Sequence, residues 1–215
     1  MGIHIIINMN VDNNFVIVYT IFMFLRSVDI DMGSLPADSS VVIDDKEPHI
    51  PSFDELFMRH VYLIGSKSKD RSTQIGAVLV SDGGIISEGY NGICRKVIDT
   101  VIERNISPEK YHWFEHGERN AIYNAARKGI KTIGSIMFTN YTPCTDCARG
   151  IIQAGVQEVV FHKQWGEVWD TVKKEKWSGH DDRTTIMFNE AGIPIRIFDM
   201  ILGVTTRISG KIYTV

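Results

Sequence analysis

The chain has 215 residues, of which 44% are hydrophobic and 23% are charged, the balance of an ordinary globular protein. Its formal net charge is −3, so no overall positive field attracts it to a nucleic-acid backbone, and a polynucleotide ligand is disfavoured. The chain contains three cysteines, and two of them stand close together, as in a metal clip rather than a disulfide framework. This use of cysteine predicts a reducing, cytoplasmic setting.

The N-terminal part of the chain contains an apolar run, 15-FVIVYTIFMFL-25. Its 11 residues fall well short of the about 20 that a membrane-spanning helix needs, so we expect no transmembrane span. Residues 1–14 lack the basic start and the small-residue cleavage site of a secretory signal. Three interpretations stay open: a strand or short helix packed on the body, a start of translation at Met32, and an interfacial anchor.

The composition changes along the chain and indicates where the folded part begins. Residues 33–52 are rich in Ser, Asp and Pro, which is typical of a linker. We therefore predict an N-terminal extension at residues 1–51, a folded domain at residues 52–200 and a C-terminal tail at residues 201–215.

The folded domain is expected to begin with a helix, because Ser52 followed by Glu55 forms a capping box and the apolar positions of 53–68 recur at near-helical spacing. Two β-like runs separated by 82-DGG-84 then give a strong hairpin signal. Strands alternating with helices predict an α/β fold with a mostly parallel five-stranded sheet covered on both faces, to which the hairpin adds one antiparallel pair. Strands are predicted at 75–81, 85–91, 135–140, 157–162 and 194–198, and helices at 53–68, 118–129, 144–155 and 182–192.

Two short motifs suggest the chemistry. His116 stands two residues before Glu118, and Pro143 is followed directly by a Cys144-x-x-Cys147 pair. Zinc takes neutral imidazole and thiolate ligands, and a catalytic zinc keeps three protein ligands and leaves the fourth position for water. One histidine and two cysteines supply that set. Both motifs fall at predicted helix starts, where the helix dipole favours negative thiolates and a proline needs no N–H partner.

Glu118 is the predicted proton-carrying acid. Bound zinc lowers the pKa of its water from 15.7 to about 7. A carboxylate beside that water can take its proton and pass it to a ring nitrogen and then to a leaving amine. The pattern H-x-E…P-C-x-x-C is typical of zinc-dependent deaminases of bases, in which the glutamate is not a zinc ligand. The alternative is a closed structural site with Cys94 as a fourth ligand, although a single cysteine is more usually a buried, inert thiol.

The sequence resembles the deoxycytidylate deaminases of the cytidine deaminase-like superfamily over roughly residues 53–200. The resemblance is carried by 74-QIGAVLV-80, 88-EGYNG-92, 115-EHGERNAI-122, 142-TPCTDCARGIIQAGVQEVVF-161 and 189-NEAGI-193. It implies a three-layer α/β/α sandwich, one catalytic Zn²⁺, conversion of dCMP to dUMP, and a homo-oligomer, with dCTP and dTTP as effectors in some members. It also implies that Asn91 lies near the bound nucleotide.

Some features depart from the family pattern. Gly117 stands where the family usually has alanine, and its backbone N–H remains available to bind the carbonyl of the base. The stretch 93–113 lacks the Pro and Gly expected after the Asn-Gly pair, which leaves the phosphate-binding residues open. Candidates for a phosphate contact are Arg95, Lys96 and Lys110.

The segment 162–180 is unusually rich in Trp and Lys. We expect either a helix packed on the body or a lid over the pocket, in which Trp165, Trp169 or Trp177 stacks on the base. Arg119, which follows the glutamate, has two interpretations as well, a salt bridge and a substrate contact.

Deamination of dCMP is the leading hypothesis. One set of alternatives keeps the chemistry and changes the substrate to cytidine, deoxycytidine, another small aminated heterocycle, or adenosine in tRNA. The tRNA alternative would need a basic face, which the net charge disfavours. A different class is a non-catalytic zinc module that only joins two helices. Glu118 argues against it, because a structural zinc has no use for a carboxylate beside an open coordination position.

Overall fold

The computed structural model describes residues 47–173 and 180–215, and the folded unit spans Pro48–Val215. The predictions for the apolar run 15–25, for a start at Met32 and for Trp177 lie outside the described residues. Within the described part of the chain, no helix is both long enough and apolar enough to cross a membrane.

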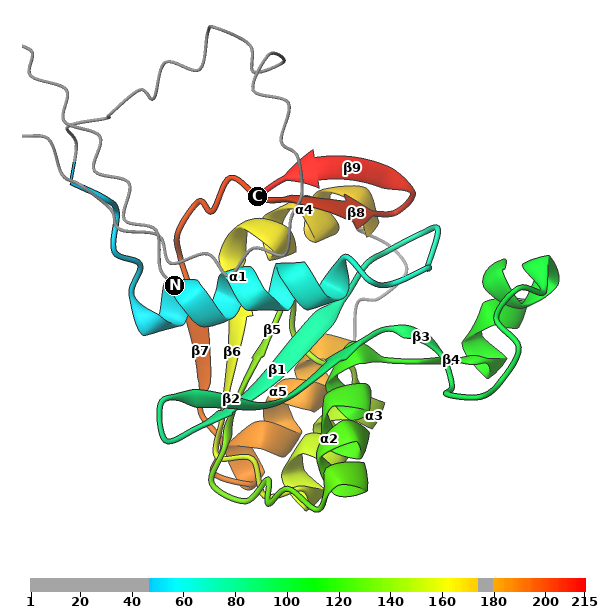
Figure 1. The fold of residues 1–215 in the computed structure, drawn as a ribbon. Helices are drawn as coiled ribbons and strands as arrows, with labels where there is room; N and C mark the ends of the chain where they lie inside the picture. The colour runs from blue at the N-terminus through cyan, green and yellow to red at the C-terminus, as the bar shows by residue number, and fades with distance from the viewer. Residues whose placement is uncertain (1–46, 174–179) are drawn as a thin grey trace, which may run out of the picture. The chain divides into compact units, whose positions relative to one another are not determined.

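A mixed sheet of five strands, in the order β2-β1-β5-β6-β7, forms the centre of the unit (Figure 1). The strands are β1 (Gly76–Ser81), β2 (Gly84–Tyr90), β5 (Ile136–Thr139), β6 (Glu158–His162) and β7 (Ile195–Phe198). The predicted α/β class and five-stranded sheet are confirmed.

The strand directions differ in one respect from the prediction. Strands β5, β6 and β7 run parallel, but β1 is antiparallel to β5 as well as to β2, so the sheet has two antiparallel pairs where one was predicted. The reason is the connection from β2 to β5 through α2 (Gly117–Lys128). Strands β2 and β5 are parallel, and the connection between them crosses over β1. Strand β1 therefore lies between these two strands and runs in the opposite direction.

Helices cover both faces of the sheet in a three-layer arrangement (Figure 1). One face carries α1 (Phe53–Gly65) and α4 (Lys163–Lys173). The other carries α2, α3 (Thr145–Gln153) and α5 (His180–Glu190). The three-layer α/β/α sandwich is therefore the observed fold.

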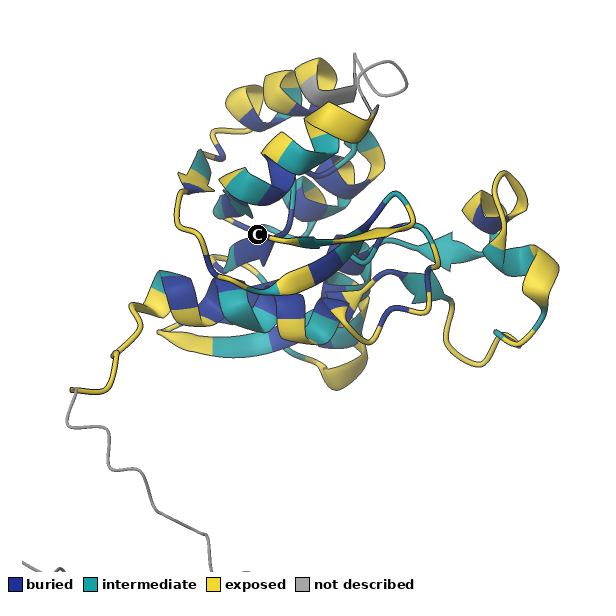
Figure 2. Ribbon diagram, turned by 90° about the horizontal axis from the view of Figure 1, so that it is seen from above, coloured by how far each residue is buried: buried dark blue, intermediate teal, exposed yellow. Residues whose placement is uncertain are grey.

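The central strand β1 shows how the two cores form. Val78 and Val80 belong to the core cluster with α1 and α4, whereas Ala77 and Leu79 belong to the cluster with α2, α3 and α5. Successive side chains of a strand point to opposite faces, so an apolar run without polar alternation is what a strand buried on both faces requires. Figure 2 shows the resulting buried centre beneath exposed helix surfaces.

Local signals in the sequence form the expected caps and turns. The Ser52 hydroxyl accepts a hydrogen bond from the backbone N–H of Glu55 at 3.1 Å, which confirms the predicted start of α1. Asp82 and Gly83 both have positive φ angles, of 50° and 74°, as the tight turn between β1 and β2 requires. Helix α2 ends at Gly129, whose left-handed backbone conformation closes the helix.

The stretch before His116 forms an arm that extends away from the sheet (Figure 1). Its base is a short antiparallel ribbon of β3 (Gly92–Ile93) and β4 (Phe114–Glu115). Two 3₁₀ helices, Ile102–Asn105 and Glu109–His112, lie between these strands.

The last residues form a hairpin of β8 (Thr205–Ile208) and β9 (Lys211–Thr214) where the sequence analysis had placed only a tail. Ile208 and Val215 are buried in the same core cluster as α1. The hairpin also holds the loop before β1, because the N–H of Gln74 donates to the carbonyl of Arg207 at 3.0 Å and the N–H of Gly210 donates to the carbonyl of Ser72 at 2.7 Å.

Strand β2 packs so closely on α2 that Gly89 has no room for a side chain. A Cβ at this position would lie 2.4 Å from the carbonyl oxygen of Gly117 and 2.3 Å from the backbone nitrogen of Ala121. We expect Gly89→Ala to lower the free energy of unfolding by about 1–3 kcal/mol or more, because strand and helix must separate. Gly84→Ala is the matched control in the same strand, because a Cβ there would have its nearest contact, the carbonyl oxygen of Ser81, at 3.8 Å. Denaturant titration of the two variants measures the difference, and equal stability would contradict the close packing.

Candidate active site

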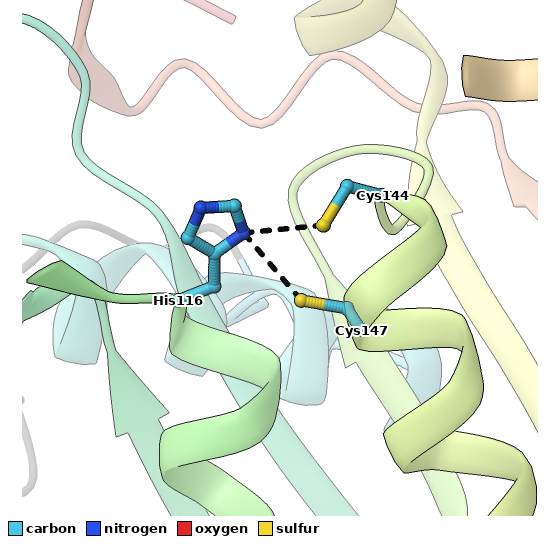
Figure 3. Close-up of side chains that lie close together, drawn as sticks. All are labelled: His116, Cys144 and Cys147. Atoms are coloured by element: carbon cyan, nitrogen blue, oxygen red, sulfur yellow. Dashed lines mark hydrogen bonds between the residues drawn. The ribbon is translucent and has the colours of Figure 1, made fainter. Parts of the chain in front are cut away.

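Two helix starts meet at one end of the sheet and bring three side chains together (Figure 3). His116 is the N-cap of α2 and follows directly from β4, and Cys144 is the N-cap of α3. Cys147 lies in the first turn of α3 and is fully buried. Each motif lies where the chain leaves a strand and enters a helix. The two motifs come together because both helices begin at this end of the sheet.

The distances fit a single metal ion. Nδ1 of His116 lies 3.4 Å from Sγ of Cys144 and 3.5 Å from Sγ of Cys147, and the three ligand atoms all lie within 4.8 Å of one another. A tetrahedral zinc, with bonds of about 2.3 Å to sulfur and about 2.1 Å to nitrogen, separates such atoms by about 3.6 Å. The cluster contains these three residues within the described part of the chain, and Cys94 is an exposed thiol outside it. The donor set therefore fits a three-ligand site.

The two cysteines share a proton. A hydrogen bond from the thiol of Cys147, together with the neighbouring His116, lowers the pKa of Cys144 to about 3 although its burial acts in the opposite direction. The same hydrogen bond and burial raise the pKa of Cys147. Deprotonation is thus favoured at Cys144, and a cation that binds both sulfur atoms must displace the proton of Cys147.

An arginine compensates the negative charge of the thiolate pair. Arg119 donates one hydrogen bond to Sγ of Cys147 at 3.5 Å and another, through Nε, to the carboxylate of Glu115 at 2.5 Å. The same carboxylate accepts the backbone N–H of His116 at 2.9 Å. Two interpretations of Arg119 were open, and the structure shows the salt bridge, with Glu115 as the partner. The same guanidinium also contacts Cys147, a candidate metal ligand.

Glu118 lies in the first turn of α2 and is only 5% exposed. Its Oε2 atom is buried and has no hydrogen-bond partner in the protein. Burial raises the pKa of this carboxyl group above its ordinary value. An unpaired buried carboxylate is costly for stability, so it is more typical of a group that exchanges protons with a ligand than of a structural contact.

A pocket opens beside this cluster. One wall is aromatic and consists of Tyr141, Trp165 and Trp169, whose two indole rings are stacked 5.2 Å apart. The segment that contains α4 is thus a helix packed on the body, as one of the two interpretations had it, and two of its tryptophans also line the pocket. The pocket is lined by Asp70, Ser72, Thr73, Ile75, Asn91, Lys110, Tyr111, Phe114, His116, Glu118, Tyr141, Thr142, Cys144, Trp165 and Trp169.

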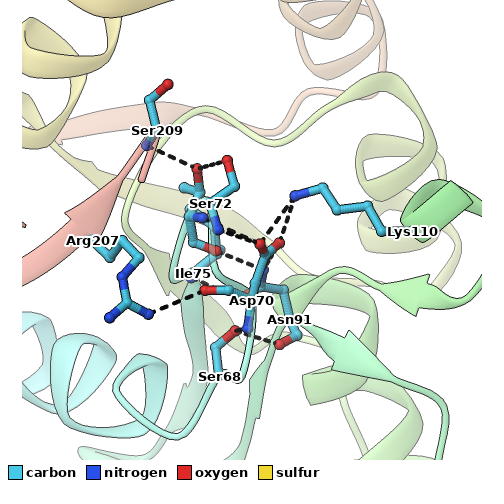
Figure 4. Close-up of polar contacts among 9 residues, drawn as sticks. Ser68, Asp70, Ser72, Ile75, Asn91, Lys110, Arg207 and Ser209 are labelled. Atoms are coloured by element: carbon cyan, nitrogen blue, oxygen red, sulfur yellow. Dashed lines mark hydrogen bonds and ion pairs between the residues drawn. The ribbon is translucent and has the colours of Figure 1, made fainter. Parts of the chain in front are cut away.

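Asn91 lines this pocket, but its side chain is already engaged (Figure 4). Its amide donates to the carbonyl of Thr73 at 2.8 Å and to the carboxylate of Asp70 at 3.2 Å, and its Oδ1 accepts the N–H of Ile75 at 2.8 Å. Asn91 therefore fixes the loop between α1 and β1. Its remaining hydrogen-bonding capacity for a ligand is one lone pair of Oδ1.

Gly117 lies between His116 and Glu118, where α2 packs against Ile75. A Cβ at this position would lie 3.1 Å from the carbonyl oxygen of Ile75, which is tight for any side chain. As the first residue of α2, Gly117 has an N–H outside the hydrogen-bond ladder of the helix. This donor is therefore free to bind an acceptor.

Sequence reasoning did not identify Asp70 or Tyr141 as residues of the site, and left Lys110 as one of three candidates. Asp70 had a weak signal, because an aspartate two residues before Ser72 is typical of a turn in which the carboxylate accepts the backbone N–H, here at 2.7 Å. Tyr141 directly follows β5 and shows no pattern of its own. Its place in the aromatic wall depends on the packing of α4.

Comparison with known proteins identifies the family. Residues 51–163 match the profile described as the cytidine and deoxycytidylate deaminase zinc-binding region. The deoxycytidylate deaminase of Homo sapiens is 34% identical over 152 residues, which cover 67% of this chain and 78% of the human protein. The deoxycytidylate deaminase of Enterobacteria phage T2 is 30% identical over 154 residues, covering 52% of this chain and 81% of the phage protein.

A solved structure shares the fold. The dCMP deaminase of the cyanophage S-TIM5, determined in complex with dCMP and dUMP, superposes with a TM-score of 0.52 at 22% identity. The superposition covers 70% of this chain and the whole of the phage chain. The profile match extends over more than half of the 215 residues and contains the three clustered side chains. This chain belongs to the family of cytidine and deoxycytidylate deaminases that is defined by this zinc-binding region.

Proposed function

We propose that this protein catalyses the hydrolytic deamination of dCMP to dUMP and ammonia, with one Zn²⁺ held by His116, Cys144 and Cys147. The observation that carries the proposal is the buried carboxylate of Glu118, whose Oε2 has no partner, beside a three-ligand cluster in one pocket. The curated relatives named deoxycytidylate deaminase support the choice of substrate.

The division of labour follows from the geometry. When bound, zinc supplies a water molecule acidified to a pKa of about 7, and hence a nucleophile at neutral pH. Glu118 moves two protons at Oε2. It accepts one from the attacking water and delivers it to N3 of the pyrimidine ring, and it then passes the second, from the oxygen now bonded to C4, to the C4 amino group, so that the C4–N bond breaks, ammonia leaves and the C4 carbonyl forms. The raised pKa of Glu118 suits this exchange, because a group that both takes and gives a proton works best near the ambient pH.

The remaining residues hold the base in place. The free N–H of Gly117 donates to the carbonyl oxygen at C2 of the ring, which fixes the distance from C4 to the reacting groups. The aromatic wall of Trp165 and Trp169 excludes water from the apolar side of the pocket. Asn91 acts mainly by holding the loop that forms the opposite wall, since both hydrogens of its amide are used within the protein.

Further aspects of the proposal concern the whole protein. We place the catalytic domain at residues 52–215, because the C-terminal hairpin holds a loop that lines the pocket. We propose a homo-oligomer in the cytoplasm with dCTP and dTTP as candidate effectors, on the family resemblance and on three free cysteines. The net charge disfavours adenosine in tRNA as the substrate. The buried Glu118 disfavours a site in which zinc has only a structural role.

Ammonia release from a panel of dCMP, dCTP, deoxycytidine and cytidine tests the proposal. Purified protein loaded with one zinc per chain is expected to release ammonia from dCMP with the highest kcat/KM of the four. Repeating the panel with added dCTP and with added dTTP tests the effectors. If none of the four compounds yields ammonia, deamination of small cytosine nucleotides is wrong.

Glu118→Gln removes the proton carrier and keeps the shape of the side chain. We expect turnover to fall by a factor of about 10²–10⁴ or more, because general acid–base catalysis contributes on that scale. Zinc content, measured by metal analysis of the purified variant, should stay at the value of the unchanged protein. Loss of the metal in this variant would instead make Glu118 a ligand.

The cysteines provide a matched pair of substitutions. Cys147→Ser should abolish zinc binding, since it removes a buried ligand of the cluster. Cys94→Ser should leave zinc content and turnover unchanged, because this thiol is exposed and outside the cluster. Zinc lost in the Cys94 variant would mean a closed site with four protein ligands.

A further inference from the structure

The carbonyl group that precedes Cys144 is held by a helix from outside the three-residue cluster. The hydroxyl of Thr184, in α5, donates a hydrogen bond to the carbonyl oxygen of Pro143 at 3.0 Å. Pro143 is bonded directly to Cys144, which is the N-cap of α3 and a proposed zinc ligand. The contact joins residues 41 positions apart and lies in the interior, since Thr184 is fully buried.

The carbonyl of Pro143 depends on a partner from elsewhere in the fold. Proline lacks an N–H, so this carbonyl is the one hydrogen-bonding group of its backbone. The hydrogen-bond ladder of α3 begins one residue later, where the carbonyl of Cys144 accepts the N–H of Ala148 at 2.8 Å. Pro143 is buried, and a buried carbonyl without a partner is costly. Thr184 therefore satisfies a group that the ladder of α3 leaves open.

One face of α5 is directed at α3. A threonine inside a helix commonly donates its hydroxyl hydrogen to a carbonyl one turn earlier in the same helix, but Thr184 donates it to the neighbouring loop. Phe188 lies one turn further along the same face of α5, and it belongs to the core cluster that contains Cys147 and Ile151 of α3. The two helices pack against each other on one side of the sheet (Figure 1). The polar contact is thus supported by apolar packing beside it.

The loop between β5 and α3 is held at both ends. At the strand end, Oδ1 of Asn140 accepts the N–H of Gly76 at 2.6 Å. At the helix end, the contact is the hydrogen bond from Thr184. Cys144 has an extended backbone, with φ −68° and ψ 168°, so helical geometry does not set its position as it does for Cys147. Metal–ligand distances tolerate deviations of only about 0.2 Å, so a small shift of this loop is enough to weaken a metal site.

We infer that Thr184 is a positioning residue of the zinc site: its hydroxyl fixes the Pro143–Cys144 peptide and so sets where the sulfur of Cys144 lies relative to the other two ligands. The inference rests on the proposed function, in which Cys144 is a zinc ligand, and it gives α5 a role in that site. Groups that hold a metal ligand in place typically contribute a factor of about 10–100 to metal affinity.

The test measures zinc affinity and needs no turnover. Zinc-loaded protein is titrated with a chromophoric chelator, and the Kd for zinc is obtained from the competition. We expect Thr184→Val, which keeps the shape of the side chain and lacks the hydroxyl, to weaken zinc binding by a factor of about 10–100. Thr184→Ser keeps the hydroxyl and should retain most of the affinity. The absorption spectrum of the cobalt(II)-substituted protein, which responds to ligand geometry, should change in the valine variant and not in the serine variant.

Thr132→Val is the matched control. The hydroxyl of Thr132 donates to the carbonyl of Ala154 at 2.7 Å, so this variant loses the same type of hydrogen bond at the opposite end of α3. It should keep the zinc affinity and the cobalt spectrum of the unchanged protein, because Ala154 is the C-cap of the helix and Cys144 is its N-cap.

A second pair of variants keeps the inference testable if Thr184→Val does not fold. Thr184→Ser and Thr184→Ala both lack the methyl group of threonine and differ from each other only in the hydroxyl. The ratio of their zinc dissociation constants therefore isolates the hydrogen bond to Pro143. We expect the alanine variant to bind zinc more weakly than the serine variant by a factor of about 10–100.

The outcomes separate this inference from the proposed function. If Thr184→Val binds zinc as tightly as the unchanged protein, or if Thr132→Val loses as much affinity, the hydroxyl of Thr184 only supports packing and the inference is wrong. If the unchanged protein binds zinc but releases no ammonia from dCMP, deamination fails while a loss of affinity in Thr184→Val still supports the inference. If the unchanged protein binds no zinc, the proposed metal site is wrong and the inference fails with it.

Discussion

The site depends on the meeting of two helix N-termini at one end of the sheet, where a single imidazole nitrogen faces two sulfur atoms. His116 begins α2 and Cys144 begins α3, and both helices pack on the same face. The close contact of β2 with α2 at Gly89 fixes the depth of the first helix. Helix starts suit this cluster, because unpaired N–H groups and the helix dipole stabilise the thiolates that a metal requires.

Opposite electrostatic environments divide the site into two parts. The thiolate pair receives the hydrogen bond of Arg119, which is itself held by Glu115, so negative charge is stabilised where a cation binds. Glu118 has no such partner at Oε2, and burial disfavours its ionised form. One carboxylate, Glu115, is thus paired with a guanidinium, while another, three residues further on, is free to exchange protons. Two carboxylates close in sequence differ in role because their surroundings differ.

The polar side of the pocket is assembled from segments that are distant in the chain. Asp70 connects the loop before β1 to the arm through Lys110 and to Asn91, which directly follows β2, and the C-terminal hairpin supports the same loop from outside (Figure 4). Each of these contacts satisfies a polar group that is buried by the others. A change in the arm or the hairpin is therefore felt in the pocket.

The sequence alone identified the candidate residues of the site and the class of the fold. Ligand type and spacing are local properties, so His116, Cys144 and Cys147 were identifiable together with the acid beside them, and the capping of α1 at Ser52 was readable as well. The hairpin at 204–215 had a local signal, since Ser209 and Gly210 form its turn between β-branched residues, but no element was predicted there. Only the tertiary structure decided that β1 lies antiparallel to β5 and that Lys110 reaches Asp70, 40 residues earlier in the chain. Such pairings depend on which buried groups must satisfy one another after the layers pack, and no local pattern encodes that.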